Sequence, residues 1–303
     1  MSYTGDLLSV TEAHAHFEMY KNPPPVVRTS LGSLNQICRG FGQRKGFAMG
    51  WYVVIGGDTG QGKSMLALQM AMEASEQGVI PGFLSFEMAE YELRNRFYSQ
   101  ALKVPSQMLE PGEHFSEATA EMVIQRLRDR RDLDPGANFY VTDDLVPDVG
   151  VVVGKMEMWL NIGVQLFVVD YLQLLEDRKT VGMAQEVQKI SAAMRDFAHH
   201  NQVVVIALSQ YNNEGGNDRT RPPHVGHLYG GRRISQDSDM TILLDHSRYE
   251  RDRAQSSKAR TWMLVPKNRH GPSGVDIPIE WDYTLLKARE GMPDEINLWP
   301  GGD

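Results

Sequence analysis

Residues 57–64 have the types and spacing that bind a phosphate chain. They are Gly57, Asp58, Thr59, Gly60, Gln61, Gly62, Lys63 and Ser64, and they satisfy the pattern G-x-x-x-x-G-K-[ST] in full. An apolar run precedes them and a helical pattern follows, so the glycines would let backbone N–H groups wrap phosphates at a helix start. Lys63 would then reach the β- and γ-phosphates and Ser64 would ligate Mg²⁺. The segment therefore predicts a site for ATP and Mg²⁺.

Three other polar residues follow apolar runs that read as strands. Asp170 follows 167–169, and an acid at the end of a strand beside the phosphate loop can hold the Mg²⁺ shell through water. Glu87 follows 83–86, where it would either polarise the attacking water or favour the dipole of the next helix. Gln210 follows 203–208 and is either a sensor of the γ-phosphate or a polar strand terminus.

The elements that must position these residues alternate along the chain from residue 52. Apolar runs and helical stretches in turn predict βαβ units and a parallel sheet. The expected strands are 52–55, 82–86, 139–142, 165–169, 203–208 and 240–244, and the expected helices are 64–76, 90–102, 116–131 and 184–200. Residues 261–266 and 275–281 predict a hairpin, and the polar segments 212–233 and 247–259 predict loops.

The order of these motifs resembles the RecA-like motor domain of DnaB-type replicative helicases, over about residues 26–285. The resemblance is carried by segments 29–34, 84–88, 170–174, 207–210, 234–239 and 267–274. It implies an α/β fold, a RecA-like P-loop ATPase with a mostly parallel central sheet flanked by helices and a C-terminal β-hairpin. It also implies that Glu87 is the catalytic base, Asp170 the Mg²⁺-associated acid and Gln210 the γ-phosphate sensor.

By the same resemblance, Lys267 and Arg269 reach into a neighbouring subunit's site and stabilise charge on the γ-phosphate. A solvated hairpin tip is the alternative for these two residues. The family's collar domain does not precede the motor in this sequence, so we expect an N-terminal arm over 1–25 and the motor over 26–303. Residues 8–20 are either a linker helix that packs on the next subunit or a frayed tail.

A basic loop follows the predicted sensor strand. Arg219, Arg221, Arg232 and Arg233 occur there without an intervening acid. In RecA-like rings this loop and the one after residue 170 line the pore, so we expect single-stranded DNA to contact Arg178, Lys179, Tyr229, Gly230, Gly231, Arg232 and Arg233. The family usually has Arg-Glu-Ser-Gly where this chain has residues 229–233, so the charge has moved. A solvated surface is the alternative.

Composition sets the remaining limits. The formal net charge is −8, which argues against a protein that coats nucleic acid generally but permits a local basic channel. The one cysteine, Cys38, permits no intrachain disulfide and fits a reducing compartment. No apolar run approaches a membrane span of about 18 residues and no signal peptide begins the sequence, so we expect no membrane partner and a cytoplasmic location. By the resemblance, the gene would be bacterial, or carried by a phage or plasmid.

The resemblance implies a hexameric ring ATPase that moves 5′ to 3′ on single-stranded DNA as a replicative helicase, with a helicase loader or primase as partner. Two other functions stay open. One is a RecA- or RadA-like recombination ATPase, which would form filaments. The other is a ring ATPase switch that hydrolyses ATP without unwinding DNA.

Overall fold

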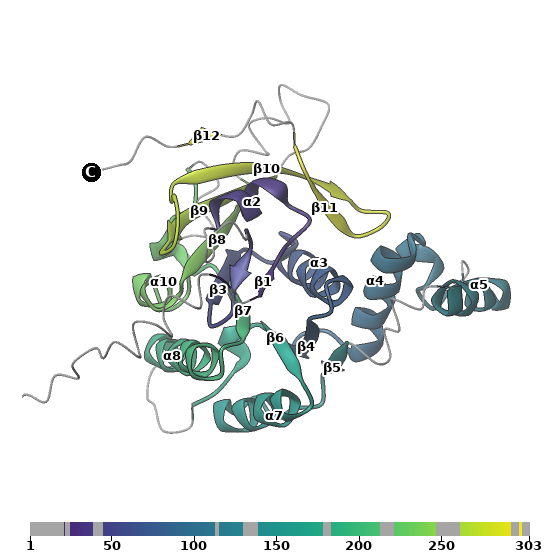
Figure 1. Ribbon diagram of the computed structural model, residues 1–303, viewed down its shortest axis with the longest axis horizontal. Coiled ribbons are helices and arrows are strands. Elements are labelled where there is room, and N and C mark those ends of the chain that lie inside the picture. The colour runs from purple at the N-terminus through teal and green to yellow at the C-terminus, as the bar shows by residue number, and fades with distance from the viewer. Residues whose placement is uncertain are drawn as a thin grey trace, which may run out of the picture.

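A computed structural model describes residues 21, 25–38, 45–112, 115–129, 139–177, 183–212, 221–246, 261–291 and 297–298. Its centre is a ten-stranded sheet in the order β11-β10-β9-β8-β3-β7-β6-β4-β5, with β12 paired to β10 (Figure 1). The strands are β3 Tyr52–Gly57, β4 Ile80–Ser85, β5 Tyr140–Thr142, β6 Val164–Asp170, β7 Val204–Gln210, β8 Met240–Asp245, β9 Thr261–Asn268, β10 Val275–Asp282, β11 Lys287–Glu290 and β12 Asn297–Leu298.

Strand direction divides the sheet into two parts. Neighbouring strands from β8 across to β5 are parallel, whereas β8, β9, β10 and β11 pair antiparallel. The parallel part contains the phosphate-loop strand β3, flanked by β7 and β8. The mostly parallel α/β fold with a C-terminal hairpin is therefore confirmed.

Helices cover both faces of the sheet (Figure 1). α3 Lys63–Glu76 and α4 Glu90–Leu102 lie on one side, and α7 Val149–Asn161 and α8 Met183–Asn201 on the other. Smaller elements are α2 Gly32–Ile37, α5 Glu117–Asp129, α10 Arg232–Asp237, the 3₁₀ turns Ser106–Met108, Leu172–Leu174 and Val225–His227, and the strand pair β1 Val26–Val27 with β2 Phe47–Ala48.

Alternation along the strands explains the two helical layers. In β3, Val53 and Ile55 pack in the same core cluster as α3 and α4, while Tyr52 and Val54 pack with α7 and α8. β6 and β7 divide their side chains in the same way. Successive side chains of a strand point to opposite faces, so strands that are apolar throughout must be covered on both sides. This is why the runs near residues 52, 165 and 203 read as buried strands.

The predicted strands, helices and hairpin are confirmed, with boundaries that shift by one to a few residues. Two differences stand out. α7 is a helix that the sequence pattern does not predict, and α10 begins inside the segment 212–233 that the pattern assigns to a loop. Residues 8–20 and 247–259 lie outside the described residues. In the part of the chain that is described, no helix has the length and apolar character needed to cross a bilayer.

Candidate nucleotide-binding site

Four parallel strands bring the predicted site residues to one edge of the sheet. Gly57 at the end of β3 is in register with Gln210 at the end of β7, and Ser85 at the end of β4 is in register with Asp170 at the end of β6. The phosphate loop, Gln210, Asp170 and the turn that carries Glu87 therefore meet at the carboxyl ends of the strands. Because β7 lies between β3 and β6, Asp170 ends the second strand from the phosphate loop, not the adjacent one.

The phosphate loop is held open by its own hydrogen bonds. The backbone N–H of Asp58 donates to Oε1 of Gln61 at 2.8 Å, and the backbone N–H of Gln61 donates to the carbonyl of Asp58 at 3.3 Å. Gly62 has a φ of +87°, a conformation that side chains disfavour, and a Cβ there would lie 2.7 Å from the ring of Trp281. Glycine is thus required at position 62 by both backbone conformation and space, and α3 begins at the next residue with its N–H groups turned toward the loop.

Lys63 is buried at the base of this loop. Only 7% of the residue is exposed, and its Nζ donates to the carbonyl of Asp58 at 2.9 Å. Burial lowers the pKa of Lys63, and the negative charges of Asp170, Glu87 and Asp58 partly offset that effect. The positive charge of Lys63 is therefore partly balanced by the three acids, and a bound phosphate chain would balance it further.

Asp170 is a buried acid close to the hydroxyl of Ser64, and within the described residues its carboxylate accepts no hydrogen bond of standard distance and angle. The residue is 0% exposed. Burial raises the pKa of the Asp170 carboxyl from 3.8 to about 6, while nearby Ser64 is the strongest influence in the opposite direction. A buried, unpaired carboxylate beside a hydroxyl is costly unless a cation joins them. Asp170 and Ser64 therefore fit a Mg²⁺ ion held together with phosphate.

Glu87 lies on a turn that a buried serine fixes. The Ser85 hydroxyl donates to the carbonyl of Met88 at 2.7 Å and accepts the backbone N–H of Met88 at 3.0 Å. Glu87 is exposed at the apex of this turn, and its charge acts on the pKa values of both Asp170 and Lys63. Glu87 is thus near Asp170 while its own side chain is exposed, an arrangement in which it could accept a proton from a water at this site.

Gln210 is fixed through its backbone. Its N–H donates to Oε1 of Gln173 at 3.2 Å, and its carbonyl accepts Nε2 of Gln173 at 3.0 Å and the backbone N–H of Tyr229 at 3.1 Å. Burial raises the pKa of Tyr171, and the hydrogen bond between its hydroxyl and the Gln210 side chain partly offsets that rise. The residue at the end of strand β7 is therefore joined both to the segment after β6 and to the loop that returns at residue 229.

Lys267 and Arg269 lie at the opposite edge of the sheet from the phosphate loop of the same chain. Lys267 pairs with Thr241 near the start of β8, and the first residue of β8, Met240, pairs with Val53 near the start of β3. Four residues of extended strand, about 13 Å, then separate Val53 from Gly57. The structure therefore does not bring these two residues to their own chain's phosphate site.

The ammonium group of Lys267 is bound to the end of α10. Its Nζ donates to the backbone carbonyls of Ser235, Gln236 and Ser238, at 2.8 Å for Gln236 and 2.6 Å for Ser238. Burial, and secondarily the charge of Arg269, lower the pKa of Lys267 to about 8. An ammonium has three N–H donors, so in this conformation Lys267 acts as a cap on the helix C-terminus.

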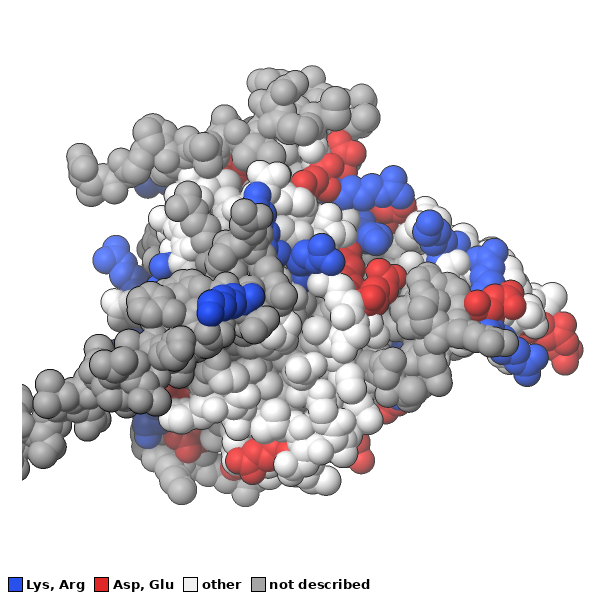
Figure 2. Space-filling view, viewed as in Figure 1, with Lys and Arg blue, Asp and Glu red and all other residues white. Residues whose placement is uncertain are grey.

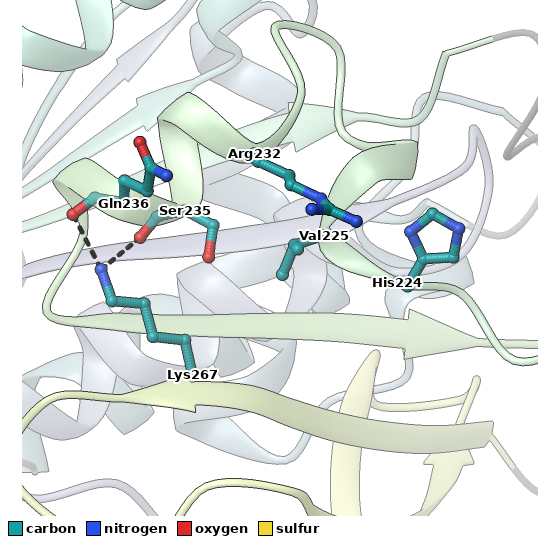
Figure 3. A pocket seen from close by; sticks show the side chains of 6 residues that line it. All are labelled: His224, Val225, Arg232, Ser235, Gln236 and Lys267. Carbon is teal, nitrogen blue, oxygen red and sulfur yellow. Dashed lines mark hydrogen bonds between the residues drawn. The ribbon is translucent and has the colours of Figure 1, made fainter. Parts of the chain in front are cut away.

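A cavity of about 550 Å³ lies between α10 and β9 (Figure 3). It is lined by His224, Val225, Arg232, Ser235, Gln236 and Lys267. The predicted DNA-contacting Arg232 and the predicted finger Lys267 therefore border the same space, one at each end of α10. This relation between the two sets of residues is absent from the linear sequence.

The predicted DNA segment is a turn followed by the start of α10. Gly230 and Gly231 have φ values of +92° and +68°, and Nε2 of Gln188 donates to the carbonyl of Gly230 at 3.0 Å. Arg232 and Arg233 are at the surface, on the first turn of the helix. Arg178 and Lys179 lie outside the described residues. In the right half of the face drawn in Figure 2, Lys and Arg side chains lie beside Asp and Glu side chains.

Two residues beside the site are not singled out by sequence reasoning. Gln173 lies within the segment 170–174, but only the register of β6 and β7 places its amide on the Gln210 backbone. Trp281 covers Gly62, and its Nε1 donates to Oγ1 of Thr261 at 2.9 Å. A tryptophan at the end of the predicted hairpin is the one sequence signal that draws attention to this position.

The fold and the residues at its strand ends define a RecA-like ATPase domain. A model of the DnaB-like helicase C terminal domain matches residues 27–288, and the chain belongs to that family of nucleotide-binding ATPase domains.

Proteins that are similar in sequence to this chain include named replicative helicases. A replicative DNA helicase DnaB of Leifsonia xyli subsp. xyli is 30% identical over 254 residues, 80% of this chain and 53% of that protein. A probable plasmid replicative DNA helicase of Chlamydia psittaci is 28% identical over 227 residues, 73% of this chain and 48% of that protein. The chain thus spans about half the length of these relatives.

Solved structures show the same fold. The ATPase domain of G40P superposes with a TM-score of 0.77 at 22% identity, covering 95% of this chain and 100% of that one. A DnaB-like replicative helicase, described with its interactions with primase, gives a TM-score of 0.76 at 20% identity and covers 94% of this chain and 68% of that one.

Proposed function

We propose that this chain is the ATP-driven motor of a ring-forming DNA helicase that translocates 5′ to 3′ on single-stranded DNA during replication. The observation that carries the proposal is the convergence of the phosphate loop, Asp170, Glu87 and Gln210 at one edge of the sheet. Membership in the DnaB-like family and relatives that are named replicative helicases support the same activity.

In this proposal the nucleotide is ATP with Mg²⁺. Lys63 and the N–H groups of the phosphate loop bind the β- and γ-phosphates, and Ser64 and Asp170 hold the cation. When bound, Mg²⁺ neutralises charge that develops on the phosphate oxygens. Glu87 accepts the proton of the attacking water, and Gln210 contacts the γ-phosphate.

Hydrolysis would take place between subunits. Lys267 and Arg269 lie at the far edge of the sheet from their own phosphate loop, so Arg269, which keeps free N–H groups, serves a neighbouring subunit's γ-phosphate, and Lys267 would join it on leaving the α10 carbonyls. We propose a hexameric ring. Each subunit then contributes to two nucleotide sites, with its phosphate loop at one interface and its finger residues at the other. A lone subunit would be nearly inactive, which restricts hydrolysis to the assembled ring.

The DNA would contact residues 229–233 together with Arg178 and Lys179. These residues offer backbone N–H groups and positive charge to phosphates without reading bases, so binding would fall with salt and ignore sequence. The Tyr229 N–H bond to the Gln210 carbonyl supports a direct link between nucleotide state and DNA loop. A primase or helicase loader is the proposed protein partner, and the bacterial cytoplasm is the proposed location.

The test combines three measurements on the full chain. ATP hydrolysis is measured with and without single-stranded DNA, the assembly mass is measured with and without nucleotide, and a forked duplex is offered for unwinding. The proposal expects rings, stimulation by single-stranded DNA and strand displacement from a 5′ tail. Lys63→Ala should keep the fold and the assembly but lose ATP hydrolysis and strand displacement. Lys155→Ala, on the outer helix α7, is the matched control. Open filaments would favour a recombinase, and hydrolysis without displacement would favour a switch.

A further inference from the structure

Asp239 is a buried acid at the junction of α10 and β8, away from the nucleotide site. Its side chain is 2% exposed. Oδ1 accepts Nη1 of Arg269 at 3.1 Å and lies 3.3 Å from Nε2 of His270. Oδ2 accepts the backbone N–H of Tyr52 at 2.9 Å and lies 3.2 Å from Nε2 of His199. Each carboxylate oxygen therefore has two partners, and Arg269 is one of the two partners of Oδ1.

The carboxylate is anchored to the centre of the sheet. The backbone N–H of Asp239 donates to the carbonyl of Tyr52 at 2.7 Å, while Tyr52 returns its own N–H to the Asp239 side chain. Tyr52 is the first residue of β3, the strand that leads into the phosphate loop, and is 0% exposed. The backbone N–H of Arg269 also donates to the carbonyl of Asp239 at 2.8 Å. Asp239 thus holds Arg269 at both its backbone and its guanidinium group.

This attachment leaves the guanidinium usable. Nη1 of Arg269 donates to Asp239 and Nη2 donates to the carbonyl of Gln236 at 3.3 Å, which uses two of five N–H groups. The side chain is 43% exposed, so the guanidinium group is accessible from outside the chain. Fixing a long side chain in advance removes the entropy that it would otherwise lose when it meets an anion.

We infer that Asp239 is a positioning residue for ATP hydrolysis in the neighbouring subunit, because it holds Arg269 in the orientation in which its free N–H groups meet that subunit's γ-phosphate. The inference rests on the proposed function, in which Arg269 acts in trans. Asp239 itself touches neither the nucleotide nor Mg²⁺. Its effect should therefore appear only through the finger that it supplies to another chain.

The test is complementation between an impaired chain, Asp239→Asn, and an inactive chain, Lys63→Ala. Asp239→Asn keeps the side-chain shape but removes the charge that holds Arg269, so ATP turnover should fall roughly 10- to 100-fold. Lys63→Ala chains have an inactive nucleotide site but an intact finger. In an equimolar mixture, roughly one quarter of the interfaces join an Asp239→Asn nucleotide site to a Lys63→Ala finger, and turnover should rise well above either variant alone. A loss that is only structural would not be restored by mixing.

Arg269→Ala mixed with Lys63→Ala tests the finger itself. If that mixture stays inactive, the trans role of Arg269 fails and the inference fails with it. If it is restored while the Asp239→Asn mixture is not, or if Asp239→Asn turns over normally alone, only the inference is overturned. Adding Asp239→Asn to Arg269→Ala should cause no further loss of turnover.

Asp237→Asn is the matched control. Asp237 is 3% exposed, and its Oδ1 lies 2.9 Å from Nη1 of Arg195 and 3.5 Å from Nε of Arg233. Hydrolysis is therefore compared without DNA, where a change at Arg233 has no DNA contact to affect. Asp237→Asn should show any loss of melting temperature that results from removing a buried charge. Mixing it with Lys63→Ala chains should not raise its ATP turnover. If Asp239→Asn does not yield folded assemblies, Asp239→Glu takes its place, because it keeps the charge and displaces the guanidinium. Normal turnover of Asp239→Glu would also overturn the inference.

Discussion

The side-chain amide of Gln173 pairs with both backbone hydrogen-bonding groups of Gln210, as a neighbouring strand would. Its Oε1 accepts the Gln210 N–H at 3.2 Å, and its Nε2 donates to the Gln210 carbonyl at 3.0 Å and to Oγ of Ser209 at 3.1 Å. The segment after β6 and the end of β7 are therefore fixed to each other at the edge of the sheet.

Gln173→Ala should uncouple nucleotide from DNA more than it lowers basal hydrolysis. The change removes the amide that holds the Gln210 backbone, while the bond from Tyr229 to the same carbonyl remains. We expect the ratio of ATP turnover with single-stranded DNA to turnover without it to fall several-fold. Gln125→Ala, on the exposed side of α5, is the control. An unchanged ratio would show that Gln173 only supports the fold.

Asp170→Asn should stabilise the protein while it abolishes Mg²⁺-dependent nucleotide binding. The folded protein binds the Asp170 proton more tightly than the unfolded chain does, because its pKa is raised from 3.8 to about 6. Stability from this group is therefore full below 3.8 and lost as the pH rises through about 6. At pH 7 the variant should be more stable by about 1–3 kcal/mol.

Chemical unfolding between pH 4 and pH 8 without nucleotide measures this difference. The gap between Asp170→Asn and the wild type should close toward pH 4. Asp144→Asn, at an exposed acid, should behave like the wild type throughout. An Asp170→Asn chain that is less stable at pH 7 would mean that the carboxylate has a partner in solution.

Lys267→Ala and Arg269→Ala should separate stability from turnover. Lys267 donates to three backbone carbonyls at the end of α10, so its loss leaves helix-end acceptors unsatisfied and should cost about 1–3 kcal/mol. That corresponds to a melting temperature lower by about 2–6 °C. Arg269 is more exposed, and its loss should lower turnover by about 10³-fold with a smaller thermal effect. Calorimetry measures the melting temperatures and steady-state hydrolysis measures the turnover. A larger loss of turnover in Lys267→Ala and a larger loss of stability in Arg269→Ala would exchange the two roles.

Arg232→Ala combined with Arg233→Ala should weaken single-stranded DNA binding in a salt-dependent way. If both side chains neutralise phosphates, the slope of log affinity against log salt should decrease in magnitude by about 1.4. Fluorescence anisotropy with a mixed-sequence oligonucleotide at several salt concentrations measures the slope. Arg126→Ala combined with Arg128→Ala, on α5, is the control for lost charge. Unchanged affinity at low salt would remove this turn from the DNA site.

Elements next to the motifs were predictable because their strands are almost entirely apolar and segments with a helical pattern follow them. α7 was not, since Val149, Val151, Val152 and Val153 favour a strand by propensity. The sign of its start is Asp148, whose side chain accepts the N–H of Gly150 at 2.9 Å. Packing against β6 and α8 then overrides the local preference.

The meeting of the candidate site residues was predictable because parallel strands end at one edge of the sheet, which brings Asp170 and Gln210 to the same edge as the phosphate loop. The position of Lys267 and Arg269 was not. It depends on the antiparallel register of β9 against β8, and the residue that holds Arg269 comes from a different strand junction. Neither the register of β9 against β8 nor the pairing of Asp239 with Arg269 can be inferred from the order of residues in the sequence.

The brevity of α10 fixes the geometry between its two ends. The helix spans Arg232–Asp237, less than two turns, with an exposed arginine at its start and carbonyls bound by Lys267 at its end. Each residue added to a helix rotates the next side chain by about 100° around the axis. A single insertion or deletion would therefore turn Arg232 away from the cavity it shares with Lys267, whereas many substitutions would leave that alignment intact. For this helix, length is a stricter constraint than composition.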